Sequence, residues 1–149
     1  MVSIKDLQNF NIFKNLSDDD LKLIAPITKK EQFEAGVRVI DENSVASKLF
    51  LVLEGRVSIK KKGAFGKREM IIDDAVPGEI VGWSALAKPH ISTAVVIATE
   101  RSVFYTIDSA ALRELLEHNT DIGYKVMKEM TSIISSRFRK VIGQFVGYI

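Results

Sequence analysis

The sequence of 149 residues contains no cysteine, which excludes disulfide bonds, cysteine-ligated zinc and thiol catalysis. It contains only two histidines, so a metal centre built from several imidazoles is not expected. No apolar stretch approaches the roughly 18 residues that span a bilayer, and the N-terminus lacks the apolar region of a secretory signal. We therefore expect a cytoplasmic protein without a membrane span.

The sequence also lacks a marked excess of one charge. Lysine and arginine number 21 and aspartate and glutamate 19, so the whole domain is not expected to follow a phosphate backbone. One local basic cluster, residues 60–62 with Lys67 and Arg68, flanks Gly63 and Gly66 and is interpreted as a solvated hairpin tip. With 46% hydrophobic residues, the chain is expected to fold as one globular domain.

Three sections divide the predicted domain: helical residues 1–26, strands over 27–107 and helices over 108–149. Ser17, followed by three aspartates, predicts a helix N-cap, and Pro26 predicts that helix's end. Apolar or alternating runs between turn residues predict strands at 37–40, 49–53, 57–60, 70–72, 91–98 and 103–107. This pattern predicts a mainly β fold with flanking helices, as a sandwich, barrel or jelly roll.

The last section predicts two helices, the first capped by Asp108 and the second long. Apolar residues recur along the long helix with alternating spacings of four and three: Met127, Thr131, Ile134, Phe138, Val141, Phe145 and Tyr148. This heptad-like stripe predicts a homodimer seam. The alternative is that the stripe packs on the chain's own barrel. We favour the dimer because Phe138 and Phe145 lie late in the helix, beyond easy reach of a compact barrel.

Residues 77–98 carry the pattern with the clearest chemistry. Gly82 allows a tight turn, residues 84–87 form a short helical turn, and a β-branched strand follows. Free backbone N–H groups at the start of a helix attract anions. The segment therefore predicts a site for a small anionic ligand.

This segment is similar to the phosphate-binding cassette of cyclic nucleotide-binding domains, such as the sensor half of catabolite activator protein and its Fnr-like relatives. Gly82, Ala85 and Leu86 match the cassette, and residues 50–59 and 119–122 resemble other parts of the family pattern. The resemblance implies the double-stranded β-helix or jelly-roll barrel as the fold. It also implies a cyclic nucleotide (cAMP or cGMP) or another small anionic ligand. It implies these binding residues: Gly82, Trp83, Ser84, Ala85, Leu86, Ser92 and Thr93.

Two departures from the family pattern indicate an altered or lost nucleotide site. The family's ribose-binding glutamate falls at Trp83, and its phosphate-binding arginine falls at Ser92. An indole cannot accept a hydrogen bond, and the hydroxyls of Ser92 and Thr93 bring no charge. We favour a pocket in which Trp83 is core filler; the alternative is a different or weakly held ligand. Arg137 is a candidate to supply charge, although we expect it on the solvated surface.

By resemblance, the function expected is a regulatory sensor module that signals through its C-terminal helix to a dimer or a protein partner. One alternative is a ligand-independent interaction or scaffold domain. Another is the sensor half of a Crp/Fnr-type transcription regulator, because the chain reaches Ile149 without a helix-turn-helix and is not expected to bind DNA directly. No catalytic or metal site is predicted, since His90 and His118 are isolated and no nucleophile or nucleotide motif occurs.

Overall fold

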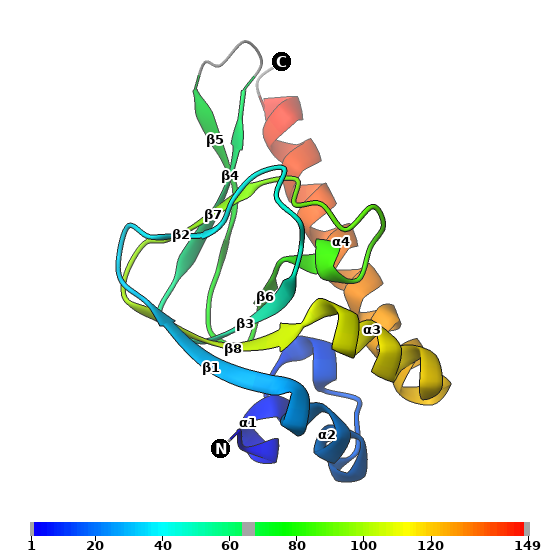
Figure 1. The fold of residues 1–149 in the computed structure, drawn as a ribbon. Helices are drawn as coiled ribbons and strands as arrows, with labels where there is room; N and C mark the ends of the chain where they lie inside the picture. The colour runs from blue at the N-terminus through cyan, green and yellow to red at the C-terminus, as the bar shows by residue number, and fades with distance from the viewer. Residues whose placement is uncertain (1, 64–67, 148–149) are drawn as a thin grey trace.

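Two four-stranded antiparallel sheets form the β part of the fold in a computed structural model that describes residues 2–63 and 68–147 (Figure 1). In spatial order, the first sheet contains β1 (Thr28–Phe33), β8 (Ser102–Asp108), β3 (Lys48–Glu54) and β6 (Ile80–Val81). The second contains β2 (Arg38–Ile40), β7 (Val95–Ala98), β4 (Val57–Lys62) and β5 (Glu69–Ala75). The predicted jelly-roll fold is confirmed, although the sheets are not closed into a barrel over the described ranges.

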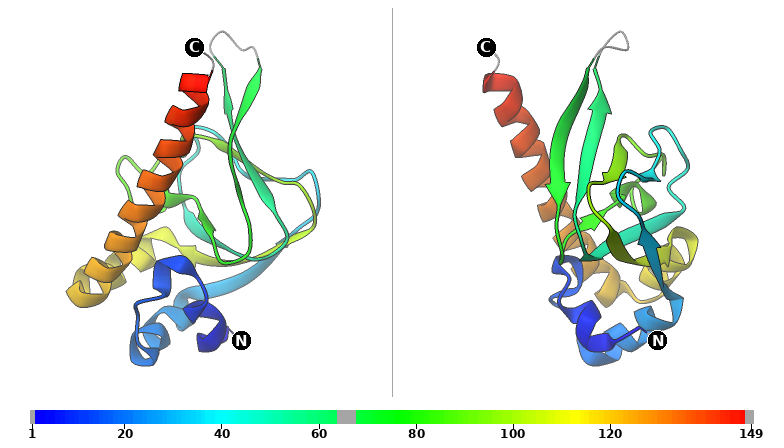
Figure 2. Two further views of the ribbon diagram at one scale, coloured as in Figure 1. Left: turned by 180° about the vertical axis from the view of Figure 1, so that it is seen from behind. Right: turned by 90° about the vertical axis from the view of Figure 1, so that its left-hand side faces the viewer.

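Helices cover one end and one side of these sheets. The short helices α1 (Ile4–Gln8) and α2 (Asp18–Ile24) precede β1, while α3 (Ser109–His118) and α4 (Thr120–Gly147) follow β8. Figure 2 shows α4 running from the end of α3 along the sheets toward the tip of the β4–β5 hairpin. No helix in the described part of the chain has the length and apolar character needed to cross a bilayer.

The predicted helix caps are confirmed. The Ser17 side chain accepts a hydrogen bond from the Asp20 amide, and the Asp20 carboxylate accepts one from the Ser17 amide, which is a complete capping box. Pro26 lies in a 3-10 turn, Ala25–Ile27, that ends the helical section. The Asp108 carboxylate accepts a hydrogen bond from the Ala111 amide at 2.9 Å and so caps α3.

Two strand predictions need correction. The strand expected over 91–98 begins only at Val95, because Ile91 forms just an isolated bridge with Val45. The alternation expected in β4 also fails at Ser58, which is buried because β4 is an inner strand between β7 and β5. The expected positions of Gly66, Lys67 and Tyr148 lie outside the described residues.

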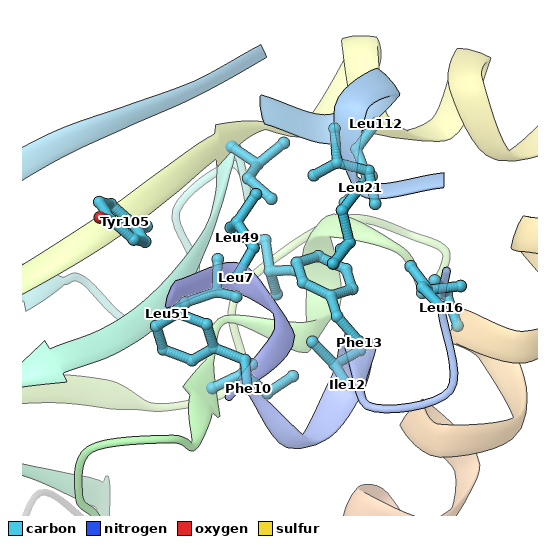
Figure 3. Close-up of a cluster of buried hydrophobic side chains, with 14 of the residues drawn as sticks. Leu7, Phe10, Ile12, Phe13, Leu16, Leu21, Leu49, Leu51, Tyr105 and Leu112 are labelled. Atoms are coloured by element: carbon cyan, nitrogen blue, oxygen red, sulfur yellow. The ribbon is translucent and has the colours of Figure 1, made fainter. Parts of the chain in front are cut away.

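Two hydrophobic clusters form the core. The first joins the N-terminal helical section to the first sheet, α3 and the first half of α4 (Figure 3). The second lies between the sheets, where Phe104 packs edge-to-face against Phe50 at 5.5 Å and Phe33 at 5.6 Å between ring centroids. The first cluster therefore anchors the beginning of α4, while the second supports the sheets.

The corner between α3 and α4 is tightly packed. Only Asn119 separates the helices, and its amide donates to the Leu115 carbonyl at 3.0 Å. A Cβ atom placed on Gly123 would lie 2.6 Å from the Leu116 carbonyl oxygen. This position therefore requires glycine for the close approach of the two helices.

Candidate functional site

A cavity of about 210 Å³ lies between the sheets and α4. Five of the predicted binding residues line it: residues 82–84, Ser92 and Thr93. Four residues of α4 also line it: Ile134, Arg137, Phe138 and Val141. The predicted residue Ala85 is instead buried in the first core cluster, and Leu86 packs against that cluster. We call this space the α4 cavity, because one helix forms its side.

The turn that begins at Gly82 shapes one wall of the α4 cavity. Gly82 has a φ of +83°, and a Cβ atom there would lie 3.1 Å from the Ile40 Cδ1 atom and 3.3 Å from the Lys48 carbonyl oxygen. The 3-10 turn Trp83–Ala85 follows, and the Ala85 amide donates to the Gly82 carbonyl at 3.0 Å. The turn uses the Ala85 amide itself, so this amide is not free to bind an anion.

Ser92 and Thr93 reach the α4 cavity from a loop and not from a strand. Ser92 is buried; its amide donates to the Ser44 carbonyl at 2.8 Å, and its hydroxyl lies 3.5 Å from the Ser44 hydroxyl. The Thr93 carbonyl accepts a hydrogen bond from Lys61 Nζ at 2.9 Å, and Lys61 also pairs with Glu42. This wall therefore offers hydroxyl groups to a ligand but no charge from its own side chains.

Arg137 brings a cation to the α4 cavity, and its expected place on the solvated surface is wrong. Its exposed fraction is 5%, its Nη2 donates to the Ile80 carbonyl, and its Nε lies 3.5 Å from Asp73 Oδ2. The guanidinium carbon lies 5.1 Å from the centroid of the Trp83 ring, a cation–π arrangement. Its Nη1 is buried and has no hydrogen-bond partner in the described ranges.

Burial and the neighbouring carboxylates shift the pKa of Arg137 in opposite directions. Burial lowers the pKa of the Arg137 guanidinium, because removal from water disfavours the charged form. Asp73 and Glu79 act in the opposite direction, because negative charges favour it. The net effect is a lowered pKa, so the charge of Arg137 is only partly compensated by its neighbours.

Phe138 was expected to lie beyond easy reach of the β part of the fold, and this expectation is also wrong. Ile134, Phe138 and Val141 line the α4 cavity, because α4 runs along the sheets instead of projecting away from them. Phe138 nevertheless keeps 62% of its surface exposed, and Phe145 keeps 68%. The stripe therefore contributes both to the chain's own cavity and to an exposed apolar face.

The two halves of α4 are held in different ways. Ile122, Val126 and Met130 are buried in the first core cluster. Further along, Lys140 Nζ contacts Asp73 Oδ1 at 3.0 Å, and Gln144 Nε2 donates to the Ile72 carbonyl at 3.3 Å. The second half of α4 thus lies on β5 through polar contacts, which carry less stabilisation than a buried apolar face.

Sequence reasoning did not identify Asp73, the residue whose carboxylate links β5 to α4. A signal for Arg137 was present, since it stands between Ile134 and Val141 on the side of the helix that faces the sheets. His90 Nδ1 donates a hydrogen bond to the Ser84 carbonyl, and His118 Nδ1 donates one to the Glu114 carbonyl. In the parts of the chain that the structure describes, no three His, Asp or Glu residues form a metal-binding group.

Comparisons with known proteins place this arrangement in context. The cyclic nucleotide-binding domain family matches residues 30–119. A protein from Geobacter metallireducens GS-15, described as cyclic nucleotide-binding, has 33% identity and a TM-score of 0.82 over 93% of this chain and 99% of that chain. The sensor domain of the transcriptional regulator DNR from Pseudomonas aeruginosa has 17% identity and a TM-score of 0.73, over 91% and 90% of the two chains.

Human cGMP-dependent protein kinase 2 also matches, with 27% identity over 97 residues. That match covers 65% of this chain but only 13% of the kinase.

Proposed function

Because this chain belongs to the cyclic nucleotide-binding domain family, we propose that it is a regulatory sensor whose ligand binds in the α4 cavity. One observation carries the proposal: residues 82–84, Ser92 and Thr93 share a single cavity with four residues of α4. A ligand there would contact the Gly82 turn and the helix at once. Binding energy is then available to change the position of the helix.

The way α4 is attached supports a signal that travels through its second half. A ligand shifts a conformational equilibrium only if its contacts differ between the two states. Arg137, Phe138 and Val141 belong to the half that rests on β5 through polar contacts, so small displacements there change cavity contacts without disturbing the first core cluster. Ile134 itself packs against that cluster, so we infer that the output of the sensor is the position of residues 137–147.

The side chains at positions 83 and 92 support an altered nucleotide site. Trp83 offers no acceptor for a ribose hydroxyl, and Ser92 offers no positive charge for a cyclic phosphate. By the family resemblance, both contacts contribute to nucleotide binding. We therefore expect weak or undetectable binding of cAMP and cGMP by the wild-type chain.

Replacing Ser92 with arginine is expected to strengthen cAMP or cGMP binding at least about tenfold, because a hydrogen bond between charged groups contributes about 1.5–3 kcal/mol. The measurement is the thermal unfolding midpoint against nucleotide concentration, since a ligand at a hundred times its dissociation constant stabilises by about 2.7 kcal/mol. Gln8→Arg adds the same charge on exposed α1 and serves as the control. If both variants fold and nucleotide raises their unfolding midpoints by the same amount, the assignment of the site is contradicted.

The wild-type chain is tested with the same assay and a wider panel of cyclic dinucleotides, nucleoside phosphates and small organic anions. A shift with any of them, reduced in Ser92→Asp, supports the sensor. A flat response to the whole panel would favour the ligand-independent interaction domain instead.

The exposed apolar face of α4 supports a second proposal, a homodimer through this helix. The face consists of the exposed residues Phe138, Ile142, Phe145 and Val146, together with Val141. Apolar patches of this kind on a helix commonly mark association surfaces. We propose that two copies of the chain pack along it, with 1–149 acting as one domain.

Phe145→Asp is expected to convert the dimer to a monomer, because the charge would be buried in the seam without a partner. The molar mass from light scattering, measured over a range of protein concentrations, gives the result. Arg139→Asp changes an exposed residue beside the stripe and is expected to leave the mass unchanged. If the wild-type chain is itself a monomer, the dimer is refuted and the face is left for a different protein partner.

A further inference from the structure

Arg137 has an unused hydrogen-bond donor in a buried position. Nε and Nη2 share one edge of the planar guanidinium group, and they face Asp73 and the Ile80 carbonyl. Nη1 lies on the other edge, where it is buried without a hydrogen-bond partner among the described residues. Buried polar groups in proteins almost always have a partner, and an unsatisfied one destabilises the fold. The missing partner is therefore an acceptor that the described chain does not itself provide.

Asp73 does not fully supply that acceptor. Its carboxylate is shared, because Lys140 Nζ lies 3.0 Å from Oδ1 and the Arg137 Nε lies 3.5 Å from Oδ2. The second distance exceeds the usual 2.7–3.2 Å of a hydrogen bond between nitrogen and oxygen. Arg137 thus retains both charge and donor capacity for an additional anion.

The remaining walls of the α4 cavity are mostly apolar. They are formed by aliphatic and aromatic side chains from both sheets and α4: Ile40, Ile59, Ile72, Val81, Val96 and Phe138. The volume of about 210 Å³ exceeds the ~150 Å³ of a cavity that holds benzene and is below the ~300 Å³ at which pockets for drug-sized ligands begin. These walls suit the apolar body of a compact molecule better than a sugar with several hydroxyl groups.

We propose that the ligand of the α4 cavity is a compact organic carboxylate, with a single ring or a short branched chain as its body. Nη1 is closed off from the cavity in this structure, so the guanidinium turns toward the ligand to donate a hydrogen bond to the carboxylate, and the body lies against the apolar walls and the face of Trp83. This inference rests on the proposed function, because it names the ligand class of the same cavity. Arg137 then takes over the anion-binding role that the family resemblance assigns to position 92.

Such a ligand would act on α4 directly. Arg137 belongs to that helix, and its other two nitrogens contact β5 through Asp73 and β6 through Ile80. A second carboxylate at Arg137 binds a different nitrogen from Asp73, but its negative charge shares the same guanidinium charge and repels Asp73, which weakens the Asp73–Arg137 attraction. Ligand binding is thereby coupled to the contact that holds the second half of α4 on the sheets.

Trp83 provides a reporter for the test, because it is the single tryptophan of the chain and lines the α4 cavity. The full chain is titrated with phenylacetate, with its neutral analogue phenylacetamide, and with cAMP, and the tryptophan fluorescence is recorded. Phenylacetate is expected to bind at least about tenfold more tightly than phenylacetamide, because only the carboxylate brings a negative charge to the guanidinium cation, whereas the amide offers a neutral carbonyl.

Arg137→Gln is expected to abolish this preference, whereas Arg139→Gln, an exposed change on the same helix, is expected to keep it. If Arg137→Gln does not fold, the ratio of the wild-type affinities for phenylacetate and phenylacetamide alone tests whether the ligand is a carboxylate. Equal binding of phenylacetate and phenylacetamide would overturn the proposal of a carboxylate ligand. An undiminished preference for phenylacetate in folded Arg137→Gln would overturn it as well.

The outcome with cAMP separates this inference from the proposed function. Tight binding of cAMP without binding of phenylacetate would refute the carboxylate and leave the sensor intact. No change in Trp83 fluorescence or in thermal midpoint with any of the three compounds would refute the ligand class and count against a ligand-binding cavity altogether.

Discussion

Replacing Asp73 with alanine is expected to lower the free energy of unfolding by about 3–5 kcal/mol, as when one partner of a buried ion pair is removed. The side chains of Asp73 and Arg137 keep only 12% and 6% of their surface exposed. Without Asp73, the charge of Arg137 would remain buried and its Nε would lose its counterion. Lys140 would also lose its contact, so the second half of α4 would detach most easily from β5.

Asp74 supplies a matched control, because it is the next residue in β5 and also pairs with an arginine. Its partner Arg56 lies at the surface, where water and salt weaken ion pairs. Asp74→Ala is therefore expected to cost far less stability than Asp73→Ala in urea-induced unfolding. Similar losses in the two variants would show that the Asp73 contacts carry no special role in holding α4.

Replacing Phe104 with alanine is expected to cost about 3–5 kcal/mol of unfolding free energy, as for other fully buried aromatic side chains. Phe104 is completely buried and packs edge-to-face against Phe33 and Phe50 in the second core cluster. Its removal would leave a cavity that β8 and its two neighbours, β1 and β3, cannot close without breaking their register.

The control for this prediction is Val45→Ala, which shortens an exposed apolar side chain near the edge of the fold. Such surface changes usually alter stability by no more than about 0.5 kcal/mol. The free energy of unfolding of both variants is measured by denaturant unfolding. A large loss for Phe104→Ala alone, with an unchanged dependence of the unfolding free energy on denaturant concentration, would confirm that the second core cluster sets the stability of the sheets. A loss of less than about 1 kcal/mol for Phe104→Ala would contradict the close packing described here.

The parts of the fold that follow from neighbouring residues could be predicted from the sequence. The capping box at Ser17, the cap at Asp108 and the long helix after Asn119 depend on spacings of only a few residues. The strand β3 was also predicted, because an inner strand buried on both faces is a continuous apolar run. By contrast, β1 is an edge strand with polar residues at 29–32, so its sequence gave no strand signal of its own.

The features of the candidate site that were missed depend on distant pairings. Arg137 looked like a surface residue because its partner carbonyl, on Ile80, stands 57 positions away along the chain. Residues 91–94 looked like strand because Ile91 and Thr93 are β-branched and lead into Val95, yet the Ser92 amide donates to the carbonyl of Ser44, which lies in a loop. Local composition cannot reveal which side chain finds a partner across the fold.

The close contact at Gly123 determines where the long helix is able to bend. The Leu116 carbonyl packs closely against Gly123, and the buried positions of α4 continue from this corner up to Met130, so α3 and the first turns of α4 are held together by the first core cluster. Ile133 and Ile134 also pack against the first core cluster, so a displacement of the second half of α4 is expected to begin beyond Ile134. Arg137 is the first residue beyond this segment whose side chain contacts both β5 and β6. A small displacement of α4 at Arg137 is therefore expected to become a larger displacement at Gly147, the end of the helix.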